Sequence, residues 1–180
     1  GFNGNISNWD VSNVTDMSNT FYNCESFNQD ISNWDVSSVT DMSFMFAQTD
    51  LFNQNIGNWN VSNVTNMSSM FANCILFNQN IGGWDVSNVT NMSNMFSLAT
   101  NFNNNGDDSI NDWVTSACTN FSYMFENNSF NQPIGNWNVS SATTISGMFF
   151  ENTNFNQDIG SWDVSNETDA SYIFYNASSL

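Results

Sequence analysis

The side chains best suited to chemistry in this sequence are oxygen donors, because the chain has 17 acidic residues and no lysine, arginine or histidine. The stretch from residue 101 to residue 112 places such groups at the offsets of an EF-hand calcium loop. The candidate ligands are Asn101, Asn103, Asn105, Asp107, Ser109 and Asp112. The match is incomplete, since the first ligand is Asn and the last is Asp rather than Glu. We therefore expect no cofactor, with calcium as the one alternative.

A second row of oxygen donors recurs directly after tryptophan. Its members are Asp10, Asp35, Asn60, Asp85, Asn138 and Asp163, and Val114 occupies the remaining place. If this position lies on one face of stacked strands, Asp10 and Asp35 are about 5 Å apart and repel each other. Calcium would bridge such a pair, whereas interleaved asparagines, water and ionic screening account for the row without a metal.

The regular spacing of these residues comes from an internal repeat. Tryptophan recurs at Trp9, Trp34, Trp59, Trp84, Trp113, Trp137 and Trp162. Each unit reads F-N-Q-x-I-x-x-W-(D/N)-V-S-x-V-T-(D/N)-M-S-x-M-F, followed by about five variable residues. A unit of about 25 residues is too small to bury a core of its own, so neighbouring units must stack. We predict a single solenoid domain over residues 1–180, with about seven coils, that is part of a longer repeat array.

Each coil is expected to contain one short parallel strand and one short helical or 3₁₀ turn. Trp and Val lie two residues apart in the I-x-x-W-x-V segment, which is strand spacing. Val14, Met17 and Phe21 follow at intervals of three and four residues, which is helical spacing. Ser, Thr and Asn recur at fixed positions between the apolar ones, and we expect them to fix turns and to hydrogen-bond the neighbouring coil.

Three departures from the pattern carry further predictions. The fifth unit has four extra residues before Ile110, where a bulge should project. The last unit has Glu167 in place of a core valine. Cys24 and Cys74 occupy equivalent positions two coils apart, about 10 Å, which exceeds disulfide reach. Together with Cys118, which replaces a core valine, they are expected to remain unpaired.

The run "FNQDISNWDVSSVTDMSFMF" at residues 27–46 resembles a repeat of 25 to 26 residues in BspA-like leucine-rich-repeat surface proteins of bacteria. The same repeat is found in mycoplasma surface lipoproteins. The Phe-x-x-Cys pairs at residues 21–24 and 71–74 and the Val-Thr-x-Met runs match its style. The resemblance covers the whole chain and implies a leucine-rich-repeat-like solenoid that is displayed outside the cell. It implies no activity, because these proteins share no catalytic residues.

Composition excludes several classes of function. Without a basic side chain the chain cannot neutralise phosphates, so nucleic acid is not an expected partner. No apolar run of about 20 residues exists to span a bilayer. General acid–base catalysis would fall to carboxylates, and their spacing suggests no convergent pair, so an enzyme is not expected.

Two functions remain. The first is a non-enzymatic extracellular surface protein, whose solenoid serves as an interaction or adhesion surface for a protein or glycan ligand. The alternative is a structural subunit of an extracellular fibre or sheath that assembles by end-to-end stacking of coils. In that case the contacts would come from Phe2 and Trp9 at one end and from Trp162, Tyr172 and Phe174 at the other.

Overall fold

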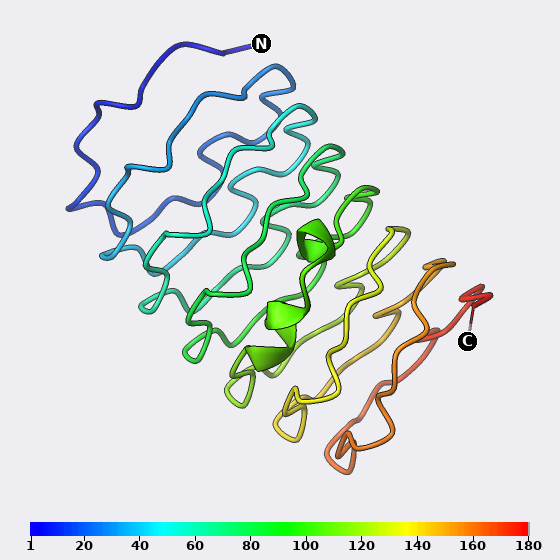
Figure 1. Ribbon diagram of the computed structural model, residues 1–180. Coiled ribbons are helices and arrows are strands. Elements are labelled where there is room, and N and C mark those ends of the chain that lie inside the picture. The colour runs from blue at the N-terminus through cyan, green and yellow to red at the C-terminus, as the bar shows by residue number, and fades with distance from the viewer. Residues whose placement is uncertain (180) are drawn as a thin grey trace.

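A computed structural model describes residues 1–179, in which the chain winds through successive coils that lie one on the next (Figure 1). The first and last coils lie at opposite ends of the stack. We number the coils from the phenylalanine that begins each unit. Coils 1 to 7 are residues 2–26, 27–51, 52–76, 77–101, 102–129, 130–154 and 155–179.

Backbone hydrogen bonds join neighbouring coils, and the donors of one segment all point the same way. In coil 1 the N–H groups of Met17, Asn19, Phe21 and Asn23 donate to carbonyl oxygens of coil 2, each at 2.9 Å. The equivalent four bonds recur at every junction between coils. A single parallel bridge, such as Asp16 with Asp41, marks the start of this segment at each junction.

The secondary structure differs from the strand and helical turn that we expected in each coil. Within residues 1–179 the parallel pairing is limited to isolated bridges, and the helices are two short 3₁₀ helices, η1 (Asn104–Gly106) and η2 (Asp108–Asp112). The reason is the backbone of the segment that follows Trp. Asn19 and Asn23 adopt positive φ angles of 58° and 57°, and the same two positions do so in every coil. A left-handed residue at every fourth position converts strand and helix into consecutive tight turns.

Aromatic columns form the core, because each phenylalanine stacks on its counterpart in the next coil. The ring centroids of Phe27 and Phe52 are 6.0 Å apart, and those of Phe46 and Phe71 are 5.6 Å apart. The two columns also touch each other, since Phe46 lies 4.0 Å from Phe52. Parallel offset rings at these separations pack more favourably than their buried area alone implies.

The tryptophans add a buried polar ladder to this core. Trp84 is 3% exposed, and its indole Nε1–H donates to the carbonyl oxygen of Ile56 in the preceding coil at 3.0 Å. The equivalent bond is present for Trp34, Trp59, Trp113, Trp137 and Trp162. The carbonyl oxygen of Ile56 also accepts the backbone N–H of Trp59 at 3.1 Å, so the indole of Trp84 is its second donor and ties the two coils together.

The invariant Asn and Thr positions form two more ladders, as the repeat predicts. The Oδ1 atom of Asn3 accepts a hydrogen bond from the backbone N–H of Asn28 at 3.0 Å, and Asn28 serves Asn53 in the same way. The N–H of Thr40 donates to the carbonyl oxygen of Thr15 at 2.8 Å. These groups cap the corners of the coil, where the backbone would otherwise lack partners.

We predict that replacing Trp84 by Phe lowers the free energy of unfolding by about 2–4 kcal/mol, because the change leaves a cavity and removes the buried hydrogen bond from the indole to the Ile56 carbonyl. The matched control is Trp9→Phe, since Trp9 is 62% exposed and should tolerate the change within about 0.5 kcal/mol. Urea titrations followed by circular dichroism would measure both. Equal losses in the two variants would contradict the assigned role of the ladder.

Candidate binding site

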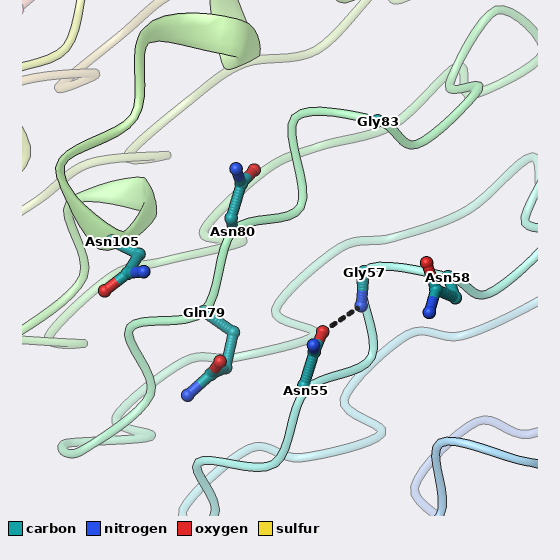
Figure 2. Close-up of a pocket in the computed structure, with 7 residues that line it drawn as sticks. All are labelled: Asn55, Gly57, Asn58, Gln79, Asn80, Gly83 and Asn105. Atoms are coloured by element: carbon teal, nitrogen blue, oxygen red, sulfur yellow. Dashed lines mark hydrogen bonds between the residues drawn. The ribbon is translucent and has the colours of Figure 1, made fainter.

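A polar pocket lies on the side of the stack where coils 3 and 4 meet the extra residues of coil 5. Its volume is about 320 Å³. It is lined by Asn55, Gly57, Asn58, Gln79, Asn80, Gly83 and Asn105 (Figure 2). The lining is five amide side chains and two glycines, so the pocket carries no charged group.

Glycines shape the pocket, and each has a separate reason to lack a side chain. A Cβ atom on Gly57 would lie 2.5 Å from the carbonyl oxygen of Asn80, so coil 4 approaches too closely for any other residue. A Cβ atom on Gly82 would clash with Ser109 of the insertion. Gly83 is different, because a Cβ atom there would meet nothing within 4 Å. The missing side chain of Gly83 therefore leaves open space in the pocket.

The insertion is held against coil 4 by buried hydrogen bonds. Asn104 is fully buried, and its Oδ1 atom accepts from the N–H of Ile81 at 2.9 Å. Its Nδ2 group donates to the carbonyl oxygen of Asp107 at 2.8 Å. The N–H of Asn105 donates to Oδ1 of Asn78 at 2.9 Å. The expected bulge is thus a loop that hydrogen bonds hold in place, and it puts Asn105 beside the pocket, as Figure 2 shows.

Of the pocket residues, only Asn105 was among the sequence candidates. The signal that would have found the others is the pair Gly82–Gly83, the one Gly-Gly dipeptide in the chain. It directly precedes Trp84 in the coil that comes before the insertion. Gly83 and the insertion of coil 5 both depart from the repeat and line the same pocket. Two such departures in neighbouring coils therefore indicate where the surface of the stack is irregular.

The row of oxygen donors after tryptophan has a local structural role. The Oδ1 atom of Asp35 accepts from the N–H of Ser37 at 3.0 Å and from its hydroxyl at 2.6 Å. The backbone bond recurs in all six members of the row: Asp10, Asp35, Asn60, Asp85, Asn138 and Asp163. Because Asp and Asn share this acceptor oxygen, they alternate freely in a turn of this kind.

These turn bonds also shift acid–base equilibria. The hydroxyl and the N–H of Ser37 hold the pKa of Asp35 below its ordinary value, and Ser87 does the same for Asp85. The charge of Asp10 opposes this effect at Asp35. The row is therefore a set of ionised turn caps in which each carboxylate is occupied by its own serine.

Three of the calcium candidates make side-chain hydrogen bonds to separate partners in the fold. Asn103 accepts from the N–H of Asn131 at 2.8 Å as part of the Asn ladder. Asp107 accepts from the N–H of Ser109 at 2.9 Å and caps η2, and Ser109 donates to Asn80 at 3.3 Å. Within residues 1–179 no three acidic, histidine or cysteine side chains are placed to hold a metal ion. Asn101 and Asp112 are exposed, and calcium binding here stays a prediction.

The three cysteines carry free thiols, as expected from their positions. Burial raises the pKa of Cys118 to about 12, and it raises that of Cys74 further. The sulfur of Cys74 lies 3.1 Å from the carbonyl oxygen of Thr49, to which it donates. Cys74 and Cys118 are therefore unreactive packing residues, and Cys24 is partly exposed.

One carboxylate in the last coil is partly buried at a position that is apolar in the other coils. Both side-chain oxygens of Glu167 are buried and make no hydrogen bond within the described part of the chain. Burial raises the pKa of this group. Its position belongs to the column that contains Val89, Cys118 and Ala142 in the coils before it.

The residues expected at the ends of the stack are exposed there to different degrees. Phe2 and Trp9 are 49% and 62% exposed in coil 1, and Tyr172 and Phe174 are 61% and 44% exposed in coil 7. Trp162 is only half-buried, but its indole still donates to Ile134 at 3.1 Å. Each terminal coil therefore presents apolar rings that a further coil would cover.

These features define a protein of stacked repeat coils with an amide-lined pocket next to the insertion of coil 5. The chain belongs to a family described as "Mycoplasma protein of unknown function, DUF285", whose model matches residues 1–109 and 103–180. Searches of curated proteins and of solved structures found no match. Neither 3₁₀ helix in the described residues has the length or the apolar character to cross a bilayer.

We predict that the double variant Asp35→Asn and Asp85→Asn is less sensitive to acid than the wild type. The pKa of each Asp is lowered in the folded state, so its stabilising effect is present above the unfolded pKa of about 3.9 and is lost as the pH falls through the folded pKa. An Asn side chain does not become protonated in this pH range, and its Oδ1 atom still accepts the hydrogen bond from the serine N–H. Thermal unfolding between pH 5 and 2.5 should show a smaller fall in Tm for the variant.

The control for this experiment is the double variant Asp50→Asn and Asp108→Asn, which removes the same charge from side chains that make no hydrogen bond in the described residues. It should follow the wild-type pH dependence. If both double variants flatten the curve equally, net charge rather than turn capping governs acid stability.

We also predict that calcium has a modest effect on stability, because three of the six candidate side chains, Asn103, Asp107 and Ser109, already make hydrogen bonds within the fold. Millimolar calcium, compared with a chelator, should move Tm by less than about 10 °C. A larger rise that is abolished by Asp107→Asn would establish the loop as a calcium site.

Proposed function

We propose that this chain is a non-enzymatic, extracellular repeat solenoid of the BspA-like, leucine-rich-repeat type, which serves as an interaction or adhesion surface. The observation that carries the proposal is how completely the repeat is used for structure. The apolar, Trp, Asn and Thr positions stack or bond to the next coil, which leaves a long, regular exterior with one amide-lined pocket. Solenoids use such extended surfaces for binding.

The composition of the chain supports this proposal over catalysis and over nucleic-acid binding. With no Lys, Arg or His, the groups that most often act as general bases or phosphate contacts are missing from the sequence. The acidic side chains of the row after tryptophan are occupied as turn caps. The expected partners are thus proteins or glycans, and we infer a location on the cell surface from the BspA-like resemblance of the repeat.

Surface display is tested with antibodies raised against the folded chain. They should label intact cells that produce the protein, and mild protease treatment of these cells should remove the signal. A cytoplasmic enzyme in the same cells must remain protected as a control for lysis. Labelling that requires permeabilised cells would refute the extracellular location.

A specific observation favours the fibre subunit as a second candidate. The carbonyl groups of Asp16, Ser18, Thr20 and Tyr22 in coil 1 accept no backbone hydrogen bond within residues 1–179. At the equivalent positions of coil 7, the N–H groups of Ala170, Tyr172, Phe174 and Asn176 donate none. Coil 1 therefore offers four carbonyl acceptors, and coil 7 offers four N–H donors with the same spacing. Coil 7 of one copy could pair with coil 1 of a second copy and so continue the stack.

Two features oppose this end-to-end contact. The chain has a net charge of −17, so two copies repel each other. Glu167 occupies a core column of coil 7, where a further coil would bury its carboxylate more deeply. Burying an unpaired charge costs several kcal/mol. Coil 7 is for this reason a poorer acceptor of a new coil than an internal coil would be.

We predict that self-association of the isolated chain increases with ionic strength, because salt screens the repulsion and leaves apolar stacking intact. Sedimentation velocity at low and high salt would measure it. The double variant Phe2→Lys and Phe174→Lys should abolish the association. The control is Leu51→Lys and Leu76→Lys, which adds the same charge at similarly exposed positions away from the ends. A monomer at every salt concentration would remove the support for a fibre.

A further inference from the structure

The pocket between coils 3 and 4 has hydrogen-bonding capacity that the fold does not use. Oδ1 of Asn55 accepts from the N–H of Gly57 at 3.0 Å, and Oδ1 of Asn80 accepts from the N–H of Gly82 at 2.9 Å. These bonds fix the side chains and leave their Nδ2 groups without an acceptor within residues 1–179. The pocket therefore presents amide donors whose orientation is set by the turns of the repeat.

Acceptors lie beside these donors. The Nε2 group of Gln79 donates to the carbonyl oxygen and to Oδ1 of Asn53, each at 2.9 Å, so its Oε1 atom remains available. Asn58 and Asn105 make no side-chain hydrogen bond in the described part of the chain, and each brings one donor group and one acceptor. Figure 2 shows these amides on neighbouring stretches of the chain, with Asn80 between Asn105 and Gly83. Hydroxyl groups both donate and accept, and they match such a mixed lining.

The charge around the pocket excludes other ligand classes. A calcium or magnesium ion needs carboxylate ligands, and none lines the pocket. An anion would find no basic partner anywhere in the chain and would be repelled by a net charge of −17. An apolar ligand would displace water from five amide side chains without replacing their hydrogen bonds. A neutral, polar ligand is the class that remains.

The pocket exists because two departures from the repeat coincide. The position of Gly83 is occupied by a larger side chain in every other coil: Asn8, Asn33, Asn58, Asp112, Asn136 and Ser161. Only coil 5 carries the insertion that supplies Asn105 as a wall. The pocket that Gly83 and Asn105 help to line has a volume of about 320 Å³, which lies in the range of small-molecule sites.

We propose that this pocket binds a neutral polyhydroxylated ligand, namely a hexose unit of a glycan. The proposal deepens the proposed function, since it gives the interaction surface a ligand class. The pocket has no exposed aromatic ring on which a sugar could stack and is open to solvent, so binding to one hexose should be weak, with a Kd of about 1–10 mM. Several copies on one surface would then bind a glycan-rich surface through multivalency.

The test is an NMR titration of the ¹⁵N-labelled chain with three neutral probes: the methyl glycosides of glucose, galactose and mannose. At least one probe should shift the side-chain amide signals of Asn55, Asn58, Asn80 and Asn105 in a saturable way. N-acetylneuraminic acid, which is an anion, should give no saturable shift at these signals. The proposal is overturned if no neutral probe perturbs them up to about 100 mM, or if the anionic sugar binds more tightly.

The decisive variant is Gly83→Asn, which restores the residue that four other coils carry at this position. A Cβ atom there meets no neighbour, so the fold should be retained, and circular dichroism checks this. The new side chain should fill the pocket and weaken binding at least tenfold. The matched control is Asn8→Gly, which makes the reverse change in coil 1 and should leave the Kd unchanged. Equal binding by wild type and Gly83→Asn would place the ligand elsewhere and refute the proposal.

A second variant separates loss of space from loss of hydrogen bonds. Asn105→Ala removes one donor and one acceptor from an exposed position without filling the pocket and should weaken binding several-fold. Binding that Asn105→Ala leaves untouched would count against the insertion as part of the site. Surface display is measured separately with antibodies, so an empty pocket on a protein that does label intact cells would refute this inference and leave the proposed function standing.

Discussion

The rest of the structure depends on the one-way backbone hydrogen bonds made by one segment of each coil, the segment that begins two residues after its Thr (Met17 to Asn23 in coil 1). In an ordinary strand, successive N–H groups point to opposite sides. Here the N–H groups of Met17, Asn19, Phe21 and Asn23 donate to coil 2, whereas those of Thr20, Tyr22 and Cys24 between them close turns within coil 1. In this segment every coil therefore donates to the coil that follows and accepts from the coil before, while the Thr, Asn and Trp ladders donate in the opposite sense. A coil can pair in only one register, and all the side-chain columns inherit that register.

This constraint explains the composition of the chain. A coil built from tight turns needs acceptors for its corner N–H groups and residues that tolerate positive φ, and Asn provides both. Asp provides the same acceptor oxygen at turn positions such as those of Asp35 and Asp85, so turn capping accounts for part of the negative charge of the chain. Basic residues supply no acceptor to a turn, which is consistent with their absence from positions of this kind.

The sequence predicts the number of coils, the columns of the core and the Asn and Thr ladders, because each follows from strict recurrence at a fixed interval. It does not predict the local conformation. The spacing of Val14, Met17 and Phe21 imitates a helix, yet the same spacing arises when tight turns follow one another. Large residues such as Phe44 and Tyr123 adopt positive φ where propensity would never place them, since the pairing with the next coil outweighs a local cost of about 1–2 kcal/mol.

The calcium loop is a prediction that the structure leaves open. The offsets of an EF-hand loop arise easily in a sequence with so many asparagines, and the side chains at residues 103, 107 and 109 make hydrogen bonds within the fold. A strictly periodic surface offers the same shape at every coil and so has no reason to recognise one ligand at one place. Specific recognition requires a break in the pattern. Gly83 and Asn105 of the insertion line one pocket, and this break is where we propose that a stack of otherwise repeated coils acquires a site of its own.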